Sequence, residues 1–185
     1  MLLKRLLAYA LYAALAATLV YAFFAGIGQT GRITARACEA LQPERAHRAA
    51  RDFTLPALDG RKQNLRQRRG KVVLLHFWAT WCPPCIEELP SLYRLQRALA
   101  GDRFELVTVS ADDSAATVQQ FFSRHKLPAL PVLMDPAQQV PHGYGTDKYP
   151  ESYLIDAQGV IRYRFVNQRD WGSPEALSCI RSLVD

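Results

Sequence analysis

The chain has 185 residues, 49% of them hydrophobic, and a formal net charge of +6. This length fits one globular domain plus an extension, because domains usually hold roughly 100 to 200 residues. The charge is uneven: residues 32–71 carry eleven Lys and Arg against four Asp and Glu, whereas residues 72–185 carry ten against thirteen. The basic part shows no pattern of interleaved aromatic side chains, so no nucleic-acid partner is expected. A solvated linker and contact with anionic lipid headgroups both remain open for it.

The first segment of the chain predicts a membrane anchor. Residues 6–27 are apolar and contain no charged side chain, and a helix needs about 20 such residues to cross a hydrocarbon layer. We therefore predict a cytoplasmic N-terminus at residues 1–5 and a transmembrane signal anchor at residues 6–27. A cleaved signal peptide is the alternative, because Lys4 and Arg5 form a short positive region. The apolar stretch is longer than the usual h-region of about 7 to 15 residues, which favours the uncleaved anchor.

The rest of the chain predicts an α/β domain behind a spacer. Residues 28–50 show no sustained apolar period and are predicted to be the spacer, and residues 51–185 are predicted to form the domain. Apolar runs and helical spacings predict a central mixed sheet with helices on both faces. The expected elements, in chain order, are a strand at 53–55, a buried strand at 71–78, a helix that ends before residue 101, a strand at 104–110, a helix at 114–126, a short strand at 130–134, a hairpin at 153–166 and a helix from 173 onward.

Two cysteines lie between the buried strand and the helix that follows it, in the segment Trp81-Cys82-Pro83-Pro84-Cys85. Two thiols one helical turn apart can interconvert with a disulfide. If Cys82 begins the helix, the helix dipole and the free backbone N–H groups stabilise its thiolate. Cys85 is then close enough to attack a mixed disulfide and release the substrate. We predict a redox-active disulfide that works without a cofactor.

Zinc is the first alternative for a Cys-x-x-Cys segment. A structural zinc site needs four ligands, usually two pairs of Cys or His. A second pair is missing here, so no metal is predicted; the remaining candidates are single or scattered, namely Cys38, Cys179, His47, His76, His125 and His142. Cys38 and Cys179 could form a disulfide or stay unpaired, and the sequence leaves both possibilities open.

The segment from Phe77 to Cys85, between a strand and a helix, resembles the active site of the thioredoxin superfamily. Within it, residues 51–185 are similar to the TlpA/ResA-like membrane-anchored thiol-disulfide oxidoreductases. Glu88-Leu89-Pro90 matches the Glu-x-Pro position of that family, residues 104–126 match its inserted strand and helix, and residues 149–156 match the segment before its hairpin. The resemblance implies a thioredoxin-like fold and the activity of a thiol-disulfide oxidoreductase, with disulfide reduction as the expected direction.

The resemblance also implies roles for individual residues. The catalytic set is Cys82, Cys85, Glu88 and Pro150. Pro150 matches the cis-proline of the superfamily, which leaves the backbone of the preceding residue free to pair with a substrate. Glu88 matches a partly buried acid with a raised pKa that would tune the thiols; an exposed helix position is the alternative for it. The substrate groove is expected to be formed by Trp81, Pro83, Pro84 and Tyr149.

His76 departs from the family, which usually has a buried Asp or Asn at this strand position. An imidazole there could relay a proton to Cys85 and would titrate nearer neutrality. The alternative is a side chain that packs and forms a structural hydrogen bond.

Location and partners are likewise implied by the resemblance. We expect a single pass through the inner (cytoplasmic) membrane, a catalytic domain in the periplasm, protein disulfides as substrates and a transmembrane electron-donor protein. Cytochrome c maturation and copper-site assembly are both implied as processes. The alternative of another class is a copper-binding assembly factor that uses Cys82, Cys85 and a histidine, His142 being the candidate. A thiol peroxidase ranks last, because the Thr-x-x-Cys arrangement of peroxiredoxins is missing.

Overall fold

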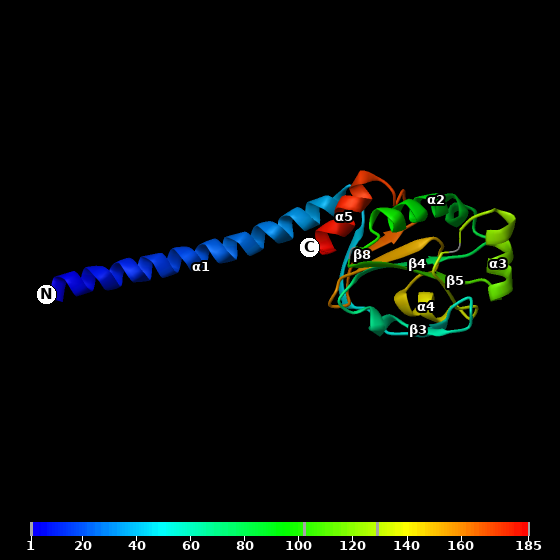
Figure 1. Cartoon of the computed structure of the whole chain (residues 1–185), viewed down its shortest axis with the longest axis horizontal. Coiled ribbons are helices and arrows are strands. Elements are labelled where there is room, and N and C mark those ends of the chain that lie inside the picture. The colour runs from blue at the N-terminus through cyan, green and yellow to red at the C-terminus, as the bar shows by residue number, and fades with distance from the viewer. Residues whose placement is uncertain (1, 102, 129, 185) are drawn as a thin grey trace.

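The computed structural model describes residues 2–101, 103–128 and 130–184; in the first helix it describes the side chains of residues 5, 9–23 and 37–39. The long helix α1 (Leu2–Glu39) projects from a domain built on one central sheet (Figure 1). The strand order in that sheet is β1-β8-β7-β4-β5-β6. The predicted α/β fold with a mixed central sheet is confirmed.

One half of the sheet, from β4 to the edge strand β6, is parallel, and the other half is antiparallel. The strand β4 pairs in parallel with β5, β5 pairs in parallel with β6, and β7, β8 and β1 continue the sheet with antiparallel pairing. All seven residues of β4 are buried, as expected of a strand that is covered on both faces. The bounds are β1 (Glu44–Ala49), β4 (Val72–Trp78), β5 (Phe104–Ser110), β6 (Val132–Met134), β7 (Glu151–Ile155) and β8 (Val160–Val166).

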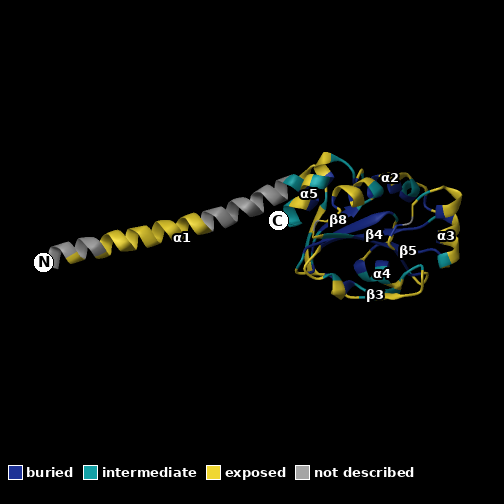
Figure 2. Ribbon diagram, in the orientation of Figure 1, coloured by how far each residue is buried: buried dark blue, intermediate teal, exposed yellow. Residues whose placement is uncertain are grey.

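Two hydrophobic clusters cover the two faces of the sheet. The helices α2 (Pro83–Ala98), α3 (Ala115–Arg124) and α5 (Pro174–Val184) contribute to one cluster. The other face is covered by α4 (Gln139–Tyr144), the 3-10 helix η1 (Leu65–Arg68) and the hairpin of β2 (Thr54–Pro56) and β3 (Lys62–Asn64). The buried sheet between exposed outer surfaces is visible in Figure 2.

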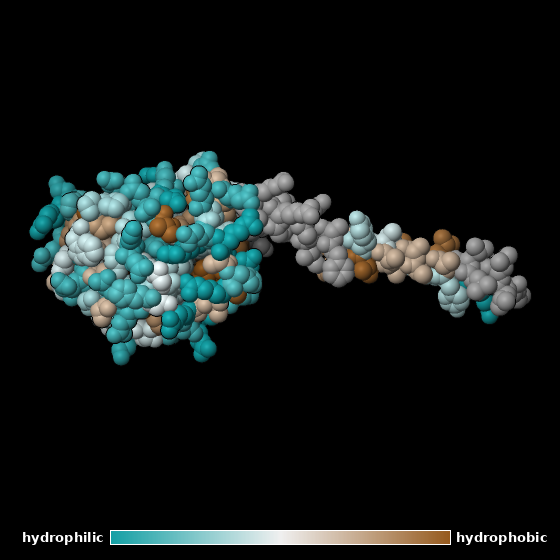
Figure 3. Space-filling view, turned by 180° about the vertical axis from the view of Figure 1, so that it is seen from behind, coloured by the Kyte–Doolittle hydropathy of each residue, from teal (hydrophilic) through white to brown (hydrophobic). Residues whose placement is uncertain are grey.

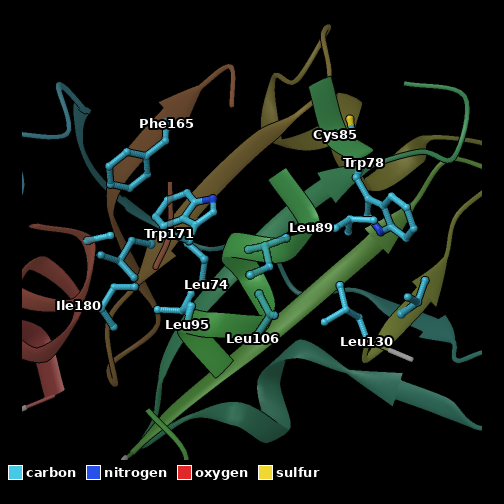
Figure 4. Close-up of a cluster of buried hydrophobic side chains, with 14 of the residues drawn as sticks. Leu74, Trp78, Cys85, Leu89, Leu95, Leu106, Leu130, Phe165, Trp171 and Ile180 are labelled. Atoms are coloured by element: carbon cyan, nitrogen blue, oxygen red, sulfur yellow. The ribbon is translucent and has the colours of Figure 1, made fainter. Parts of the chain in front are cut away.

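Side chains of β4 point alternately to the two faces of the sheet, so every second residue packs against α2. Leu74 and Trp78 pack in the cluster that contains Leu89 of α2, whereas Val73 and Phe77 pack in the other. Figure 4 shows Phe165 and Trp171 at one end of the first cluster and Trp78 at the other. Because successive side chains of a strand point to opposite faces, the residue between Leu74 and Trp78 at the same parity also faces α2. That residue is His76.

The edge strand β1 lies inside the segment that was predicted to be a spacer. The sheet therefore begins at Glu44, before the boundary expected at residue 51. The side chains of β1 are exposed at five of its six positions, so the strand has no apolar alternation that a sequence pattern could reveal. It is held instead by backbone pairing with β8 along one side. Charged side chains such as those of Arg45 and Arg48 are typical of a protected sheet edge.

Cys38 and Cys179 form a disulfide between the end of α1 and α5, with their Cα atoms 4.5 Å apart. Both residues are fully buried, and α5 lies beside the end of α1 in Figure 1. The possibility that the sequence left open is thus decided in favour of pairing. The disulfide ties the N-terminal helix to the last helix of the domain.

The described part of α1 carries exposed apolar side chains. Residues 9–23 are all exposed, among them Tyr12, Leu15 and Phe23, and this part of the helix is mostly tan, brown or white in Figure 3, whereas the domain surface is largely teal. Within the described residues, no helix meets the combined demands of length and apolar character for crossing a membrane. The side chains of residues 6–8 and 24–27, which belong to the predicted anchor, lie outside the described set.

Candidate active site

The dithiol lies where β4 passes into α2. Cys82 is the N-cap of α2 and forms a disulfide with Cys85, with 5.3 Å between their Cα atoms. Pro83 and Pro84 occupy the first helical positions, where a missing N–H is tolerated. The first free amide of the helix is therefore that of Cys85, and it donates to Sγ of Cys82 at 3.3 Å. Cys82 is 5% exposed and Cys85 is fully buried, as expected for an attacking and a resolving thiol.

Asp112 holds the loop that leads to Cys82, and sequence reasoning missed it. Its carboxylate accepts hydrogen bonds from the backbone N–H of Thr80 at 3.0 Å, the Thr80 hydroxyl at 2.6 Å and the Ser110 hydroxyl at 2.6 Å. Because β4 and β5 are parallel neighbours, their carboxyl ends meet at the same sheet edge. An acidic residue two positions after the end of β5 was the available signal.

The segment before β7 meets the dithiol loop through aromatic side chains. The bond between Tyr149 and Pro150 is cis, as the resemblance implies. The Tyr149 ring contacts the Trp81 ring edge-on, with 6.0 Å between centroids. The Tyr149 hydroxyl donates to Oε1 of Gln138 at 2.9 Å, and burial raises the pKa of Tyr149 to about 12, so the hydroxyl stays protonated. Trp81 and Tyr149, both predicted for the substrate groove, are thus brought together.

The surface near the dithiol combines buried and exposed groups. Trp81 is 61% exposed. Among the described residues after α1, it is the one large hydrophobic side chain that is exposed. Pro83 is exposed and Pro84 is half-buried. The residue after Pro150, Glu151, is buried and accepts hydrogen bonds from Arg164 at 2.7 and 2.9 Å, which secures this end of β7.

Glu88 lies one turn after Cys85 on α2 and is buried at 3% exposure, so the exposed alternative is wrong for it. Its Oε1 accepts hydrogen bonds from the backbone N–H of Arg169, at 3.1 Å, and from the indole N–H of Trp171. Its Oε2 has no partner among the described residues. Burial raises the pKa of Glu88 to about 8, although the two donors and the charge of Arg169 oppose that rise. Sequence reasoning missed Arg169 and Trp171, which come from the distant segment after β8.

His76 is fully buried on β4, facing α2. Its Nδ1 lies 2.8 Å from the hydroxyl of Ser152 on β7, and its Nε2 lies 3.9 Å from Oε2 of Glu88. Burial lowers the pKa of His76 to about 3. The prediction that it titrates nearer neutrality is wrong, because no carboxylate in hydrogen-bond contact offsets the cost of burying an imidazolium. Although 3.9 Å is an ion-pair distance, burial disfavours both charges, so we assign an uncharged pair at pH 7.

The family model described as AhpC/TSA matches residues 46–164, from β1 to β8. The chain belongs to the AhpC/TSA family. The matched residues include the dithiol, Glu88, Asp112 and Pro150.

Individual proteins of this kind carry thiol-disulfide names. The chain is 40% identical over 116 residues to the thioredoxin-like protein YneN of Bacillus subtilis, covering 61% of this chain and 66% of YneN. It is 35% identical over 113 residues to the thiol-disulfide oxidoreductase ResA of Geobacillus thermodenitrificans, covering 61% of this chain and 64% of ResA. These alignments span slightly less than two thirds of each relative. A crystal structure of a candidate thiol:disulfide interchange protein DsbE from Chlorobium tepidum is 31% identical, covers 75% of this chain and 97% of that one, and has a TM-score of 0.67.

The copper-binding alternative requires a cluster of side chains that can hold a metal ion. Within the part of the chain that the structure describes, no three His, Cys, Asp or Glu side chains are grouped to hold a metal ion. His142, the histidine considered for copper, is an exposed residue of α4.

The pair of Glu88 and His76 predicts how stability depends on pH. The folded state holds a proton on Glu88 that the unfolded chain releases, so the contribution of Glu88 is lost as pH rises from 4.5 to about 8. The folded state keeps His76 neutral while the unfolded chain protonates it, so the contribution of His76 is lost as pH falls from 6.5 to about 3. The joint contribution is therefore greatest between pH 4.5 and 6.5.

Urea unfolding of the wild type and of Glu88→Gln at several pH values checks this dependence. The wild type is expected to lose more free energy of unfolding than the variant between pH 6.5 and about 8. Parallel curves for the two proteins would contradict it. Groups other than Glu88 contribute equally to both and cancel in the difference.

Proposed function

We propose that the chain is a thiol-disulfide oxidoreductase that reduces disulfides in other proteins through Cys82 and Cys85. The observation that carries the proposal is the Cys82–Cys85 disulfide at the N-terminus of α2, in which Cys82 is 5% exposed and Cys85 is fully buried. The names of the relatives ResA and DsbE support the same activity. No cofactor is needed, because the two sulfurs themselves carry the electrons.

The reaction follows from the order of exposure along α2. The Cys82 thiolate, stabilised by the helix N-terminus, attacks one sulfur of a substrate disulfide and releases the other as a thiolate. Cys85 then loses its proton and attacks Cys82, which releases the second substrate thiolate and leaves the Cys82–Cys85 disulfide. Two electrons pass from the dithiol to the substrate, and the two thiol protons end on the substrate sulfurs. Trp81 and Tyr149 form the wall along which the substrate lies, next to Pro150.

We further propose that α1 anchors this domain to the inner membrane by residues 6–27, with the domain in the periplasm. Exposed apolar side chains along residues 9–23 support the anchor. The buried disulfide of Cys38 and Cys179 supports an oxidising compartment, since such disulfides persist outside the cytoplasm. The substrates would be protein disulfides, for example in cytochrome c maturation or copper-site assembly, and a transmembrane protein would supply the electrons.

A direct assay tests the proposed activity. The full chain in mild detergent is reduced, freed of reductant and mixed with an oxidised substrate protein, and free thiols on both proteins are counted over time. The proposal expects one substrate disulfide reduced per chain, with Cys82 and Cys85 oxidised in the same measure. Substrate that stays oxidised while the dithiol stays reduced would refute the proposal.

Glu88→Gln tests the role of the buried acid. While Glu88 is ionised its negative charge disfavours a nearby thiolate, so we expect the variant to show faster alkylation of the reduced dithiol above pH 8 and a simpler pH profile. Alkylation rates of Cys82 from pH 5 to 10 provide the measurement, with Glu87→Gln, one exposed residue earlier on α2, as the matched control. Profiles that coincide for Glu88→Gln and the wild type would remove Glu88 from the mechanism.

A further inference from the structure

Two buried polar atoms, one on α2 and one on β4, lie close to each other. Oε2 of Glu88 and Nε2 of His76 are 3.9 Å apart, and neither has a hydrogen-bond partner among the described residues. Unpaired polar atoms in a protein interior cost about 1 to 3 kcal/mol each. A hydrogen bond between these two would need an approach of ~1 Å. Each of the two atoms is therefore the nearest candidate for a hydrogen bond to the other.

Ser152 can hydrogen-bond to Nδ1 of His76 in either tautomer of the ring. Its hydroxyl lies 2.8 Å from Nδ1, and a serine hydroxyl can donate or accept. Nδ1 can therefore be satisfied with or without its proton. Neither of the strands flanking β4 offers a charge at this level, since the residues that pair with His76 are Thr108 on β5 and Ser152 on β7.

We propose that His76 is a positioning residue that changes its tautomer with the protonation state of Glu88, so that a closer approach of Nε2 and Oε2 forms a hydrogen bond between them in either state. When Glu88 is ionised, Nε2–H donates to Oε2 and the Ser152 hydroxyl donates to Nδ1. When Glu88 is protonated, Oε2–H donates to Nε2 and Nδ1–H donates to Ser152. The proposal rests on the proposed function only in its purpose, which is to let Glu88 take up and release protons during thiol exchange.

The proton count of the exchange is simple. The imidazole carries one N–H in both states, and Ser152 keeps its hydroxyl proton while turning from donor to acceptor. The cluster as a whole gains one proton, which resides on Oε2 of Glu88. The imidazole itself stays neutral, in keeping with its full burial and lowered pKa.

The groups around Glu88 set the local charge, and a surface hollow gives solvent protons access to its carboxyl group. Along α2 the titratable residues nearest to Glu88 in sequence are Glu87 and Cys85. Arg169, on the segment after β8, contributes a charge that favours the ionised form of Glu88. A surface hollow of about 360 Å³, lined by α2 and residues 168–170, reaches Glu88 from the side. Its rim carries Glu87, Arg94 and Asp170. Glu88 can thus exchange protons with solvent through this hollow.

Nitrogen-15 NMR of the imidazole tests the proposal in the oxidised full chain. In that form the cysteines are joined and do not titrate, so the measurement reports Glu88 alone. We expect the ring proton of His76 to lie on Nδ1 at low pH and to move to Nε2 with a midpoint equal to that of the Glu88 carboxyl carbon signal. In Glu88→Gln the His76 tautomer is expected to be the same at every pH. His125, exposed at the end of α3, is the internal control and should not follow the Glu88 midpoint.

Three results would overturn the proposal: one unchanged tautomer through the Glu88 titration, two protonated ring nitrogens at neutral pH, or the same tautomer change in Glu88→Gln. The wild-type titration decides the matter even if the variant folds poorly. Thiol exchange is measured separately on the same preparation. A protein that reduces disulfides without the tautomer change refutes this inference alone, whereas one that reduces none refutes the proposed function.

Discussion

Cys82→Ser is expected to abolish disulfide reduction, whereas Cys85→Ala is expected to retain the first step and stop at the mixed disulfide. The reason is the asymmetry of the site, in which Cys82 is the N-cap of α2 and is 5% exposed, whereas Cys85 is fully buried. Without Cys85 nothing within the site attacks the bond between Cys82 and the substrate. Non-reducing electrophoresis of the two variants, mixed in reduced form with a substrate disulfide, measures the trapped species.

The control for this trap is the double variant Cys82→Ala/Cys85→Ala, which has no attacking sulfur and should trap nothing. A trapped species in the double variant would move the attack to another sulfur. Reductive activity that persists in Cys82→Ser would likewise contradict the assignment of the two thiols. In cells, the proteins held by Cys85→Ala would identify the substrates.

Removal of the disulfide between Cys38 and Cys179 is expected to lower the free energy of unfolding by about 2 to 5 kcal/mol. The two cysteines are 141 residues apart in sequence, so the bond constrains nearly the whole unfolded domain. The loss is a large fraction of the roughly 5 to 15 kcal/mol that stabilises a typical protein. Urea unfolding of the double variant Cys38→Ala/Cys179→Ala under non-reducing conditions provides the measurement.

The chain itself offers the matched control for that measurement. Cys82 and Cys85 are only three residues apart, so their disulfide constrains the unfolded chain far less. The double variant Cys82→Ala/Cys85→Ala should therefore lose much less stability than Cys38→Ala/Cys179→Ala. Equal losses in the two double variants would show that the long link contributes nothing through the length of its loop.

Much of the central fold could be predicted from local patterns. The buried strand β4 is a continuous apolar run, and α2 buries Leu89, Leu92 and Leu95 at helical spacing. The helix expected at 114–126 is α3, with Ser114 as its N-cap accepting the N–H of Thr117. Such elements are visible in sequence because burial on defined faces imposes a period on the apolar residues.

Other elements carried no such period. The edge strand β1 is exposed along most of its length, and its place in the sheet depends on backbone bonds to β8, which any side chain permits. The short helix α4 was not predicted either, since six residues are too few to show a helical pattern. Their positions depend on tertiary contacts.

The sequence by itself showed the dithiol between a strand and a helix, and its resemblance to the thioredoxin superfamily singled out Glu88 and Pro150, because each of these lies in a short contiguous motif. Only the tertiary structure decided that Cys38 pairs with Cys179, that Asp112 holds the dithiol loop, and that His76 stays neutral beside Glu88. The physical reason is that a pKa and a hydrogen-bond partner depend on what surrounds a group in space. For His76 those surroundings come from β7 and α2, far from it in the chain.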